Sequence, residues 1–206
     1  MITLHKFEGK NNQLVEELCQ NELNEQLENM FYTTVEQEVG LFKSKKIILE
    51  AVTKKEIIEY VKNYIKELSN KINIQINSEV RIDDENKIIN VLLVSDNNNI
   101  IIGYNGKTLE AIQLMLRQNL KELGKFGLKV VVDIGNYKAK KLKNLEFEIK
   151  KICKEVLKSK VEVKLDPMNS YERRIVHSIV SQFENLQSIS NGEEPNRYTI
   201  IKLKDE

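Results

Sequence analysis

The chain has 206 residues, with 32 basic and 31 acidic side chains, a net charge of +1 and 41% hydrophobic residues. These values are typical of a folded chain with one large domain or two to three small domains. No apolar run approaches the ~18 residues of a membrane span, and residues 1–9 lack a signal-peptide pattern. Cys19 and Cys153 are isolated, so neither a disulfide framework nor a zinc site is expected. We therefore expect a cytoplasmic protein with no transmembrane segment, no metal and no cofactor.

The near-neutral total conceals a gradient of charge along the chain. Residues 1–52 contain five basic and nine acidic side chains, a net charge of −4, whereas residues 137–206 contain fifteen and eleven, a net charge of +4. Nine lysines fall within residues 137–160: Lys138, Lys140, Lys141, Lys143, Lys150, Lys151, Lys154, Lys158 and Lys160. A Lys-rich helix is usually just solvated, so on its own this segment is weak evidence for polyanion binding.

Residues 1–52 predict a β-α-β-β unit. We expect strands at residues 2–7, 31–39 and 46–52, with the last two joined through residues 40–44. The helix between the first two strands is expected to turn Leu14, Leu18 and Leu23 toward its apolar side. About fifty residues is close to the lower limit for a self-sufficient core.

Residues 53–136 predict the order α-β-β-α-α-β. The first helix is expected to start at Thr53, because Thr53-Lys-Lys-Glu56 has the form of a capping box. The other elements are expected as strands at 72–82 and 87–94, a short apolar turn at 99–102, a helix reaching Leu123, and a strand at 126–134.

Residues 137–206 begin with a long Lys-rich helix, expected to end near residue 158. We then expect a strand at 161–165, a helix containing residues 170–180, and strands at 186–190 and 197–203. The predicted fold class is α+β, with three small modules at residues 1–52, 53–136 and 137–206. Because no Pro-, Ser- or Gly-rich linker separates the modules, we expect them to lie close together.

The loop Gly103-Tyr104-Asn105-Gly106 is the first candidate binding element. A bare G-x-x-G pattern is weak evidence, but here it immediately precedes an amphipathic helix within an α-β-β-α-α-β order. Glycines allow a nucleic-acid backbone to approach closely, and the free N–H groups of the following helix attract a phosphate. Lys107 adds a full positive charge at the same place.

The second candidate lies in the segment of residues 170–180. Arg173 and His177 are four residues apart, so on a helix they project from one face, with Arg174 beside them. Apolar residues fall on the opposite side: Ile175, Val176, Ile179 and Val180. A cation and an imidazole on a rigid face suit a phosphate, although a solvated helix face would look the same. Loss of charge on His177 near pH 7 would make such a contact pH-sensitive.

These motifs resemble known families. Residues 53–136 resemble a type II KH domain with residues 103–106 as its loop. Residues 137–206 resemble the Arg-x-x-x-His ("R-three-H") single-stranded nucleic-acid-binding domain through Asp166-Pro-Met-Asn-Ser-Tyr-Glu-Arg-Arg-Ile-Val-His177 and Gly192-Glu-Glu-Pro-Asn-Arg197. The two in this order, after a β-α-β-β unit containing Gly40-Leu-Phe-Lys-Ser-Lys-Lys46, are similar to the bacterial Jag family of SpoIIIJ-associated, KhpB- or EloR-like proteins.

The resemblance implies a non-catalytic, cytoplasmic regulator that binds single-stranded RNA and is linked to cell elongation, division and shape. It implies as partners a small single-KH protein or a second copy, and peripheral association of the first module with a membrane insertase. The expected RNA-binding residues are Gly103, Tyr104, Asn105, Gly106, Lys107, Arg173, Arg174, His177, Arg197, Lys138, Lys140 and Lys141. The chain departs from the family in three ways. Tyr and Asn stand where KH loops frequently have Lys or Arg, the first hairpin is degenerate, and the long charged linker after it is missing.

Two other function classes stay open on the sequence. A hydrolase would have to use His177 as its acid or base, because the only other histidine is His5, and no nucleophile elbow or P-loop is present. The cluster at residues 83–85 could attract a divalent ion, but it lies in an expected solvated turn. The second alternative is a protein-interaction scaffold with weak RNA binding, associated with the membrane insertase or the cell-wall machinery. The acidic first module favours this alternative for that module.

Overall fold

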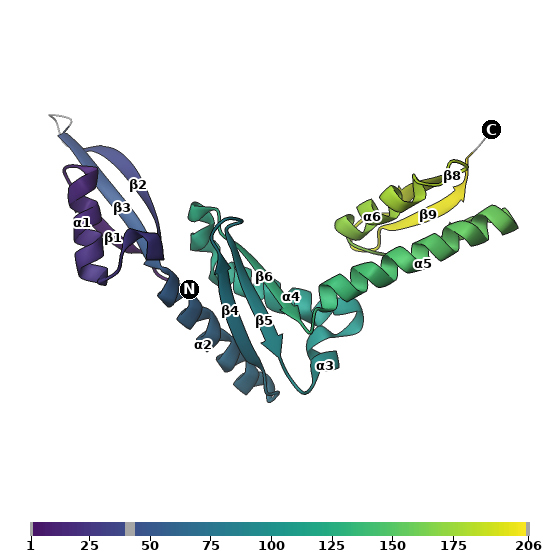
Figure 1. Cartoon of the computed structure of the whole chain (residues 1–206), viewed down its shortest axis with the longest axis horizontal. Helices are drawn as coiled ribbons and strands as arrows, with labels where there is room; N and C mark the ends of the chain where they lie inside the picture. The colour runs from purple at the N-terminus through teal and green to yellow at the C-terminus, as the bar shows by residue number, and fades with distance from the viewer. Residues whose placement is uncertain (1, 40–43, 205–206) are drawn as a thin grey trace. The chain divides into compact units, whose positions relative to one another are not determined.

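The computed structural model describes residues 2–39 and 44–204, and the chain divides into two compact units, Met1–Gly135 and Asn136–Glu206. In the described residues the strands form three three-stranded sheets, two in the first unit and one in the second, each accompanied by helices (Figure 1). The mixed α and β architecture predicted from the sequence is confirmed.

The first sheet, with one helix against it, contains the order predicted for the N-terminal residues. Its elements are β1 (His5–Gly9), α1 (Asn12–Leu23), a 3₁₀ turn η1 (Leu27–Asn29), β2 (Met30–Val39) and β3 (Ser44–Thr53). The strands are antiparallel in the order β1-β3-β2. The Asn11 side chain caps α1 by accepting a hydrogen bond from the Leu14 amide at 2.8 Å. The predicted turn at residues 40–43 lies outside the described residues.

The apolar side predicted for α1 was wrong for Leu14 and Leu18, whereas Leu23 packs against the core as predicted. Leu14 and Leu18 are 41% and 36% exposed, whereas Val15 and Cys19 are fully buried against the sheet. Successive residues of a helix differ in direction by about 100°. The residues one position after the two leucines, Val15 and Cys19, therefore face the core. The prediction followed the largest apolar side chains, while the sheet is contacted by the smaller pair.

The second sheet belongs to the predicted α-β-β-α-α-β order, which is confirmed. The elements are α2 (Lys54–Ile72), β4 (Asn77–Asp83), β5 (Ile88–Val94), α3 (Asn98–Ile102), the 3₁₀ turn η2 (Tyr104–Gly106), α4 (Lys107–Asn119), the 3₁₀ helix η3 (Lys121–Phe126) and β6 (Lys129–Ile134). Strand β5 lies between β4, to which it is antiparallel, and β6, to which it is parallel.

The start of α2 follows the sequence prediction, but its end does not. Thr53 Oγ1 accepts from the Glu56 amide at 3.1 Å and Glu56 Oε2 accepts from the Thr53 amide at 2.8 Å, which completes the capping box. The strand predicted from residue 72 begins only at residue 77. The helix continues to Ile72 and ends where Asn73 adopts a left-handed conformation with φ 53°.

A largely buried carboxylate links the first sheet to the 3₁₀ helix η3 of the second module. Glu50 of β3 has a side chain that is 14% exposed, and it pairs with Lys6 at 2.8 Å and with Lys125 of η3 at 3.0 Å. Hydrogen bonds from these two lysines lower the pKa of Glu50. The rings of Phe31 and Phe126 approach to 6.4 Å between centroids. The first module is therefore packed on the second rather than attached only through the chain.

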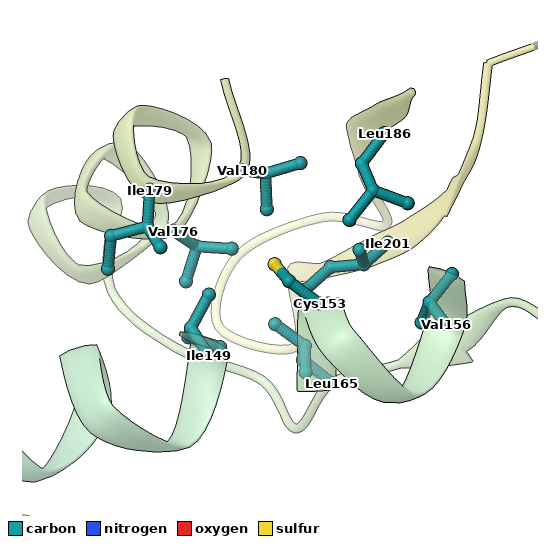
Figure 2. Packing of buried hydrophobic residues seen from close by; sticks show 9 residues of the cluster. All are labelled: Ile149, Cys153, Val156, Leu165, Val176, Ile179, Val180, Leu186 and Ile201. Atoms are coloured by element: carbon teal, nitrogen blue, oxygen red, sulfur yellow. The ribbon is translucent and has the colours of Figure 1, made fainter. Parts of the chain in front are cut away.

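The second unit has a two-helix layer on a small sheet. Its elements are α5 (Tyr137–Ser159), β7 (Val163–Lys164), α6 (Ser170–Val180), β8 (Leu186–Asn191) and β9 (Tyr198–Leu203), with the antiparallel order β7-β9-β8. The predicted strand at 161–165 is shorter than expected. Figure 2 shows the core between these layers, made by Ile149, Cys153, Val156, Leu165, Val176, Ile179, Val180, Leu186 and Ile201.

We predict that Ile201→Ala lowers the free energy of unfolding of this unit by about 2–5 kcal/mol, because it removes a fully buried side chain from the centre of the core. The matched control is Ile189→Ala in the neighbouring strand, where the side chain is 41% exposed. Amide hydrogen exchange of α5 and β9 measures the change locally. Equal losses of protection in the two variants would contradict the assigned core.

Candidate nucleic-acid interface

The backbone of the loop between α3 and α4 requires its two glycines. Gly103 has φ 70°, and a Cβ there would lie 2.1 Å from the Thr108 hydroxyl oxygen, so another residue does not fit. Gly106 has φ 86° and is buried. Asn105, with φ 51°, occupies the left-handed region that Asn tolerates better than most residues. The loop is therefore a tight turn that exposes Tyr104 and Asn105 just before α4.

The outer side of this loop combines an aromatic ring, a cation and a helix start. Tyr104 is 77% exposed, and Lys107 Nζ lies 6.0 Å from the centre of its ring. Helix α4 starts at Lys107 without a side-chain cap, so the first amides of the helix have no such partner. Amides at a helix start, together with a lysine, suit a phosphate group.

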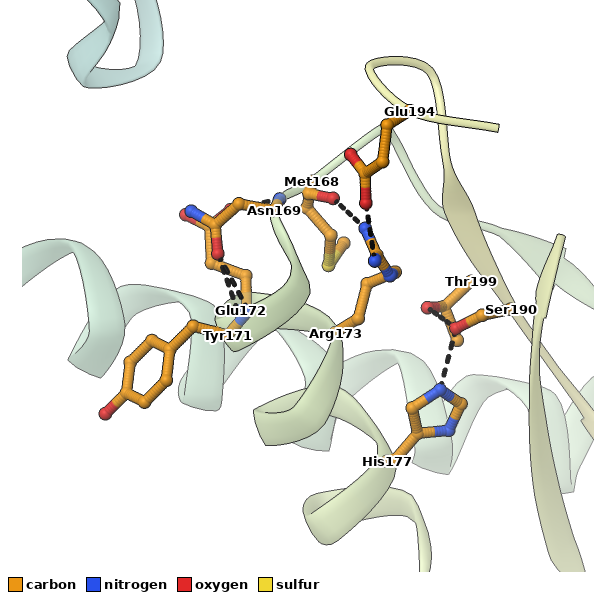
Figure 3. A network of polar contacts seen from close by, with 9 residues as sticks. All are labelled: Met168, Asn169, Tyr171, Glu172, Arg173, His177, Ser190, Glu194 and Thr199. Atoms are coloured by element: carbon orange, nitrogen blue, oxygen red, sulfur yellow. Dashed lines mark hydrogen bonds and ion pairs between the residues drawn. The ribbon is translucent and has the colours of Figure 1, made fainter. Parts of the chain in front are cut away.

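In the second unit, Arg173 points inward instead of into solvent as the sequence pattern suggested. Its side chain is 8% exposed. Nη1 donates to the Met168 carbonyl at 2.6 Å and Nη2 donates to Glu194 Oε1 at 2.7 Å (Figure 3). The guanidinium therefore joins the segment before α6 to the connection between β8 and β9.

His177 lies one turn further along α6, between two serine hydroxyls of β8. Nδ1 is 2.6 Å from Ser188 Oγ and Nε2 is 2.7 Å from Ser190 Oγ, which in turn lies 3.1 Å from Thr199 Oγ1. Burial lowers the pKa of His177, and the nearby charges of Arg173 and Arg197 lower it further. The imidazole is therefore neutral at pH 7, and its titration moves to more acidic pH than the sequence suggested.

The remaining predicted cations occupy different environments. Arg174 and Arg197 are exposed, and Arg197 is close enough to His177 to lower its pKa. Lys141 pairs at 2.7 Å with Glu172, whose other oxygen accepts from the Asn169 amide in the capping box of α6. The other two predicted lysines of α5 also differ, since Lys140 is exposed and Lys138 is half-buried.

Sequence reasoning missed the partners of the Arg and His side chains. Glu194 is 21 residues from Arg173, so local spacing contained no signal for that ion pair. The serines could have been found, because Ser188 and Ser190 alternate in a predicted strand and alternate residues share a face. Among the described residues, no group of three or more His, Cys, Asp or Glu is placed to hold a metal ion. No helix in the described part of the chain is long and apolar enough to cross a membrane.

Two domain families match the segments that contain the candidate residues. A KH domain family matches residues 56–138, and the R-three-H domain family matches residues 142–203. The chain is 31% identical to the RNA-binding protein KhpB of Clostridium symbiosum over 163 residues, which is 79% of this chain and 73% of that protein. It is 29% identical to the RNA-binding protein KhpB of Bacillus subtilis over 168 residues, 81% of this chain and 80% of that protein. The chain therefore belongs to the KhpB family, the Jag family that its sequence resembles.

Proposed function

We propose that the chain is a non-catalytic regulator that binds single-stranded RNA. The observation that carries the proposal is the loop at residues 103–107, where Gly103 has no room for a Cβ and an uncapped helix begins beside Lys107. A KH loop of this kind holds the backbone of about four nucleotides. The family relatives are named as RNA-binding proteins, which supports the same proposal.

In the second unit, we assign contact with RNA to one pair of residues and the positioning of that pair to other residues. Arg174 and Arg197 are exposed cations, so they are the side chains that reach phosphates. Arg173 is buried and paired, and it positions the connection from which Arg197 projects. His177 is held neutral between Ser188 and Ser190, and it contributes hydrogen bonding rather than charge.

The cellular role follows from the family resemblance. We propose post-transcriptional regulation in the cytoplasm, linked to cell elongation, division and shape, with a small single-KH protein or a second copy as partner. The first module, with its net charge of −4, suits a protein partner better than RNA. For this module the alternative is a scaffold function, with peripheral association with a membrane insertase.

The KH loop is tested by changing its charge while leaving both glycines in place. Tyr104→Asp/Lys107→Glu introduces two carboxylates, and Tyr104→Asn/Lys107→Gln is the neutral control of nearly the same shape. We expect the charged variant to bind a single-stranded oligouridylate about tenfold or more weakly than the neutral control, because a carboxylate near a phosphate costs about 1 kcal/mol even in water. Fluorescence anisotropy measures both affinities. Equal affinities would show that phosphates do not approach this loop.

In the second unit, variants separate the residues that contact RNA from the residue that holds the structure in place. Arg174→Ala and Arg197→Ala should each weaken RNA binding and reduce the slope of log affinity against log salt by about 0.7, without loss of stability. Arg173→Ala should lower the thermal stability as well, because it leaves the Met168 carbonyl and Glu194 without their partner. If Arg173→Ala weakened binding at unchanged stability, Arg173 would be a direct contact instead.

The protonation of His177 gives a direct spectroscopic prediction. Its NMR titration should have a midpoint below 6.5, and Arg197→Ala should raise that midpoint by removing a nearby positive charge. The chain contains only two histidines, so His5→Gln assigns the signals. A midpoint at or above 6.5 would contradict the buried, cation-flanked imidazole.

The same pKa change predicts how stability depends on pH. The pKa of His177 is lower in the folded than in the unfolded chain. The contribution of the neutral imidazole to the free energy of unfolding is therefore complete above about pH 6.5, and it is lost as the pH falls through the folded pKa. Urea unfolding should show that the free energy of unfolding falls more between pH 7 and pH 5 for the wild type than for His177→Gln. Equal losses would contradict this linkage.

A further inference from the structure

Helix α5 has two faces of opposite character. Ile149, Cys153 and Val156 point into the core of the second unit (Figure 2). On the other side of the helix, residues at intervals of three or four form a row that we call the lysine face: Lys143, Phe147, Lys150, Lys154 and Lys158. All five are exposed, and the row extends over about 22 Å of helix.

Phe147 is the unusual member of this face. Its side chain is 74% exposed, although burial of a phenylalanine is normally favourable. Within the described residues no ring contact or cation–π contact involves Phe147. Its neighbours on the helix surface, one turn before and one turn after, are Lys143 and Lys150. An open aromatic ring therefore lies among lysines.

Two acidic residues of α5, Glu146 and Glu155, lie one turn from lysines of this face, but in the described residues neither forms an ion pair with them. In the described part of the chain, none of Lys143, Lys150, Lys154 and Lys158 forms an ion pair. The ion pair within α5 joins Lys151 and Glu155 at 3.9 Å, and neither residue belongs to the row. The lysine face therefore offers four positive charges to a polyanion.

We propose that the lysine face is a further contact surface for single-stranded RNA, in which Phe147 stacks on a base and the flanking lysines bind phosphates. The inference rests on the proposed RNA-binding function and adds a site to it. Grooves that bind single strands without sequence preference combine aromatic stacking platforms with cations that follow the backbone. The lysine face has both parts on one rigid helix.

A strand of RNA fits this surface better than a second copy of the chain. Two copies meeting through the same face would place like charges against each other, which is unfavourable. Phosphates have the opposite charge and bases have an apolar face, so RNA matches both the lysines and the ring. We expect the lysine face to bind RNA of any base sequence, because every base can stack on an aromatic ring.

The experiment compares two lengths of RNA on the full chain. Phe147→Ala and Lys143→Gln/Lys150→Gln/Lys154→Gln are measured with a long oligouridylate and with one of about four nucleotides, the length that a KH loop holds. Lys55→Gln/Lys62→Gln/Lys66→Gln, at three exposed positions of α2, is the matched control for net charge. Phe147→Leu keeps an apolar side chain but removes the ring.

For the long RNA, we expect Phe147→Ala and Phe147→Leu to weaken binding at least about fivefold. The triple lysine variant should reduce the salt slope by about 2 relative to the α2 control. Affinity for the short RNA should not change. Unchanged affinity for long RNA in both α5 variants would overturn the inference while leaving the proposed function in place, whereas no RNA binding by the wild type would overturn the proposed function itself. If Phe147→Leu bound the long RNA like the wild type, the ring would not stack on a base and the inference would be wrong. If Phe147→Ala changed the oligomeric state in sedimentation, a second copy of the chain would be the occupant, which would also overturn the inference.

Discussion

A buried guanidinium must be paired, and this requirement organises the second unit. The Arg173 side chain is 8% exposed, and leaving such a charge without partners would cost several kcal/mol. Its two hydrogen bonds hold the Met168 carbonyl before α6 and Glu194 between β8 and β9. These two segments are far apart in the sequence, and Arg197 lies at the end of the second one. The most prominent residue of the motif thus acts through the structure that it holds together.

The same arrangement explains the state of His177. Arg173 and Arg197 are close enough to disfavour a charged imidazole, and burial acts in the same direction. Hydroxyl groups suit a neutral ring, because Ser188 and Ser190 can each donate or accept as the tautomer requires. The Arg-x-x-x-His pair therefore gives one structural cation and one neutral polar group. The exposed arginines around it carry the charge that we propose binds phosphates.

Sequence patterns within a few residues predicted much of the fold, but they could not predict contacts between residues that are far apart in the sequence. The capping box at Thr53 and Glu56 and the inward side of α6 follow from spacings of three and four residues, so both could be predicted. The exposed Leu14 and Leu18 could not, because helix periodicity leaves the direction of a short stripe undefined until a sheet packs on it. The burial of Arg173 depends on Glu194, a partner that only the tertiary structure brings near. The loop at residues 103–107 was predicted because its glycines, lysine and helix start are neighbours in sequence.

The two proposed RNA contacts are the loop at residues 103–107 in one unit and the surface that carries Arg174 and Arg197 in the other. Photocrosslinking of the full chain to a uridine-rich single strand, with the modified peptides mapped by mass spectrometry, examines both contacts in one experiment. We expect crosslinks at Tyr104 and its neighbours and in the peptides containing Arg174 and Arg197, and far fewer crosslinks to an equimolar duplex. Crosslinks confined to residues 1–52, or no excess over the duplex, would contradict both proposed contacts.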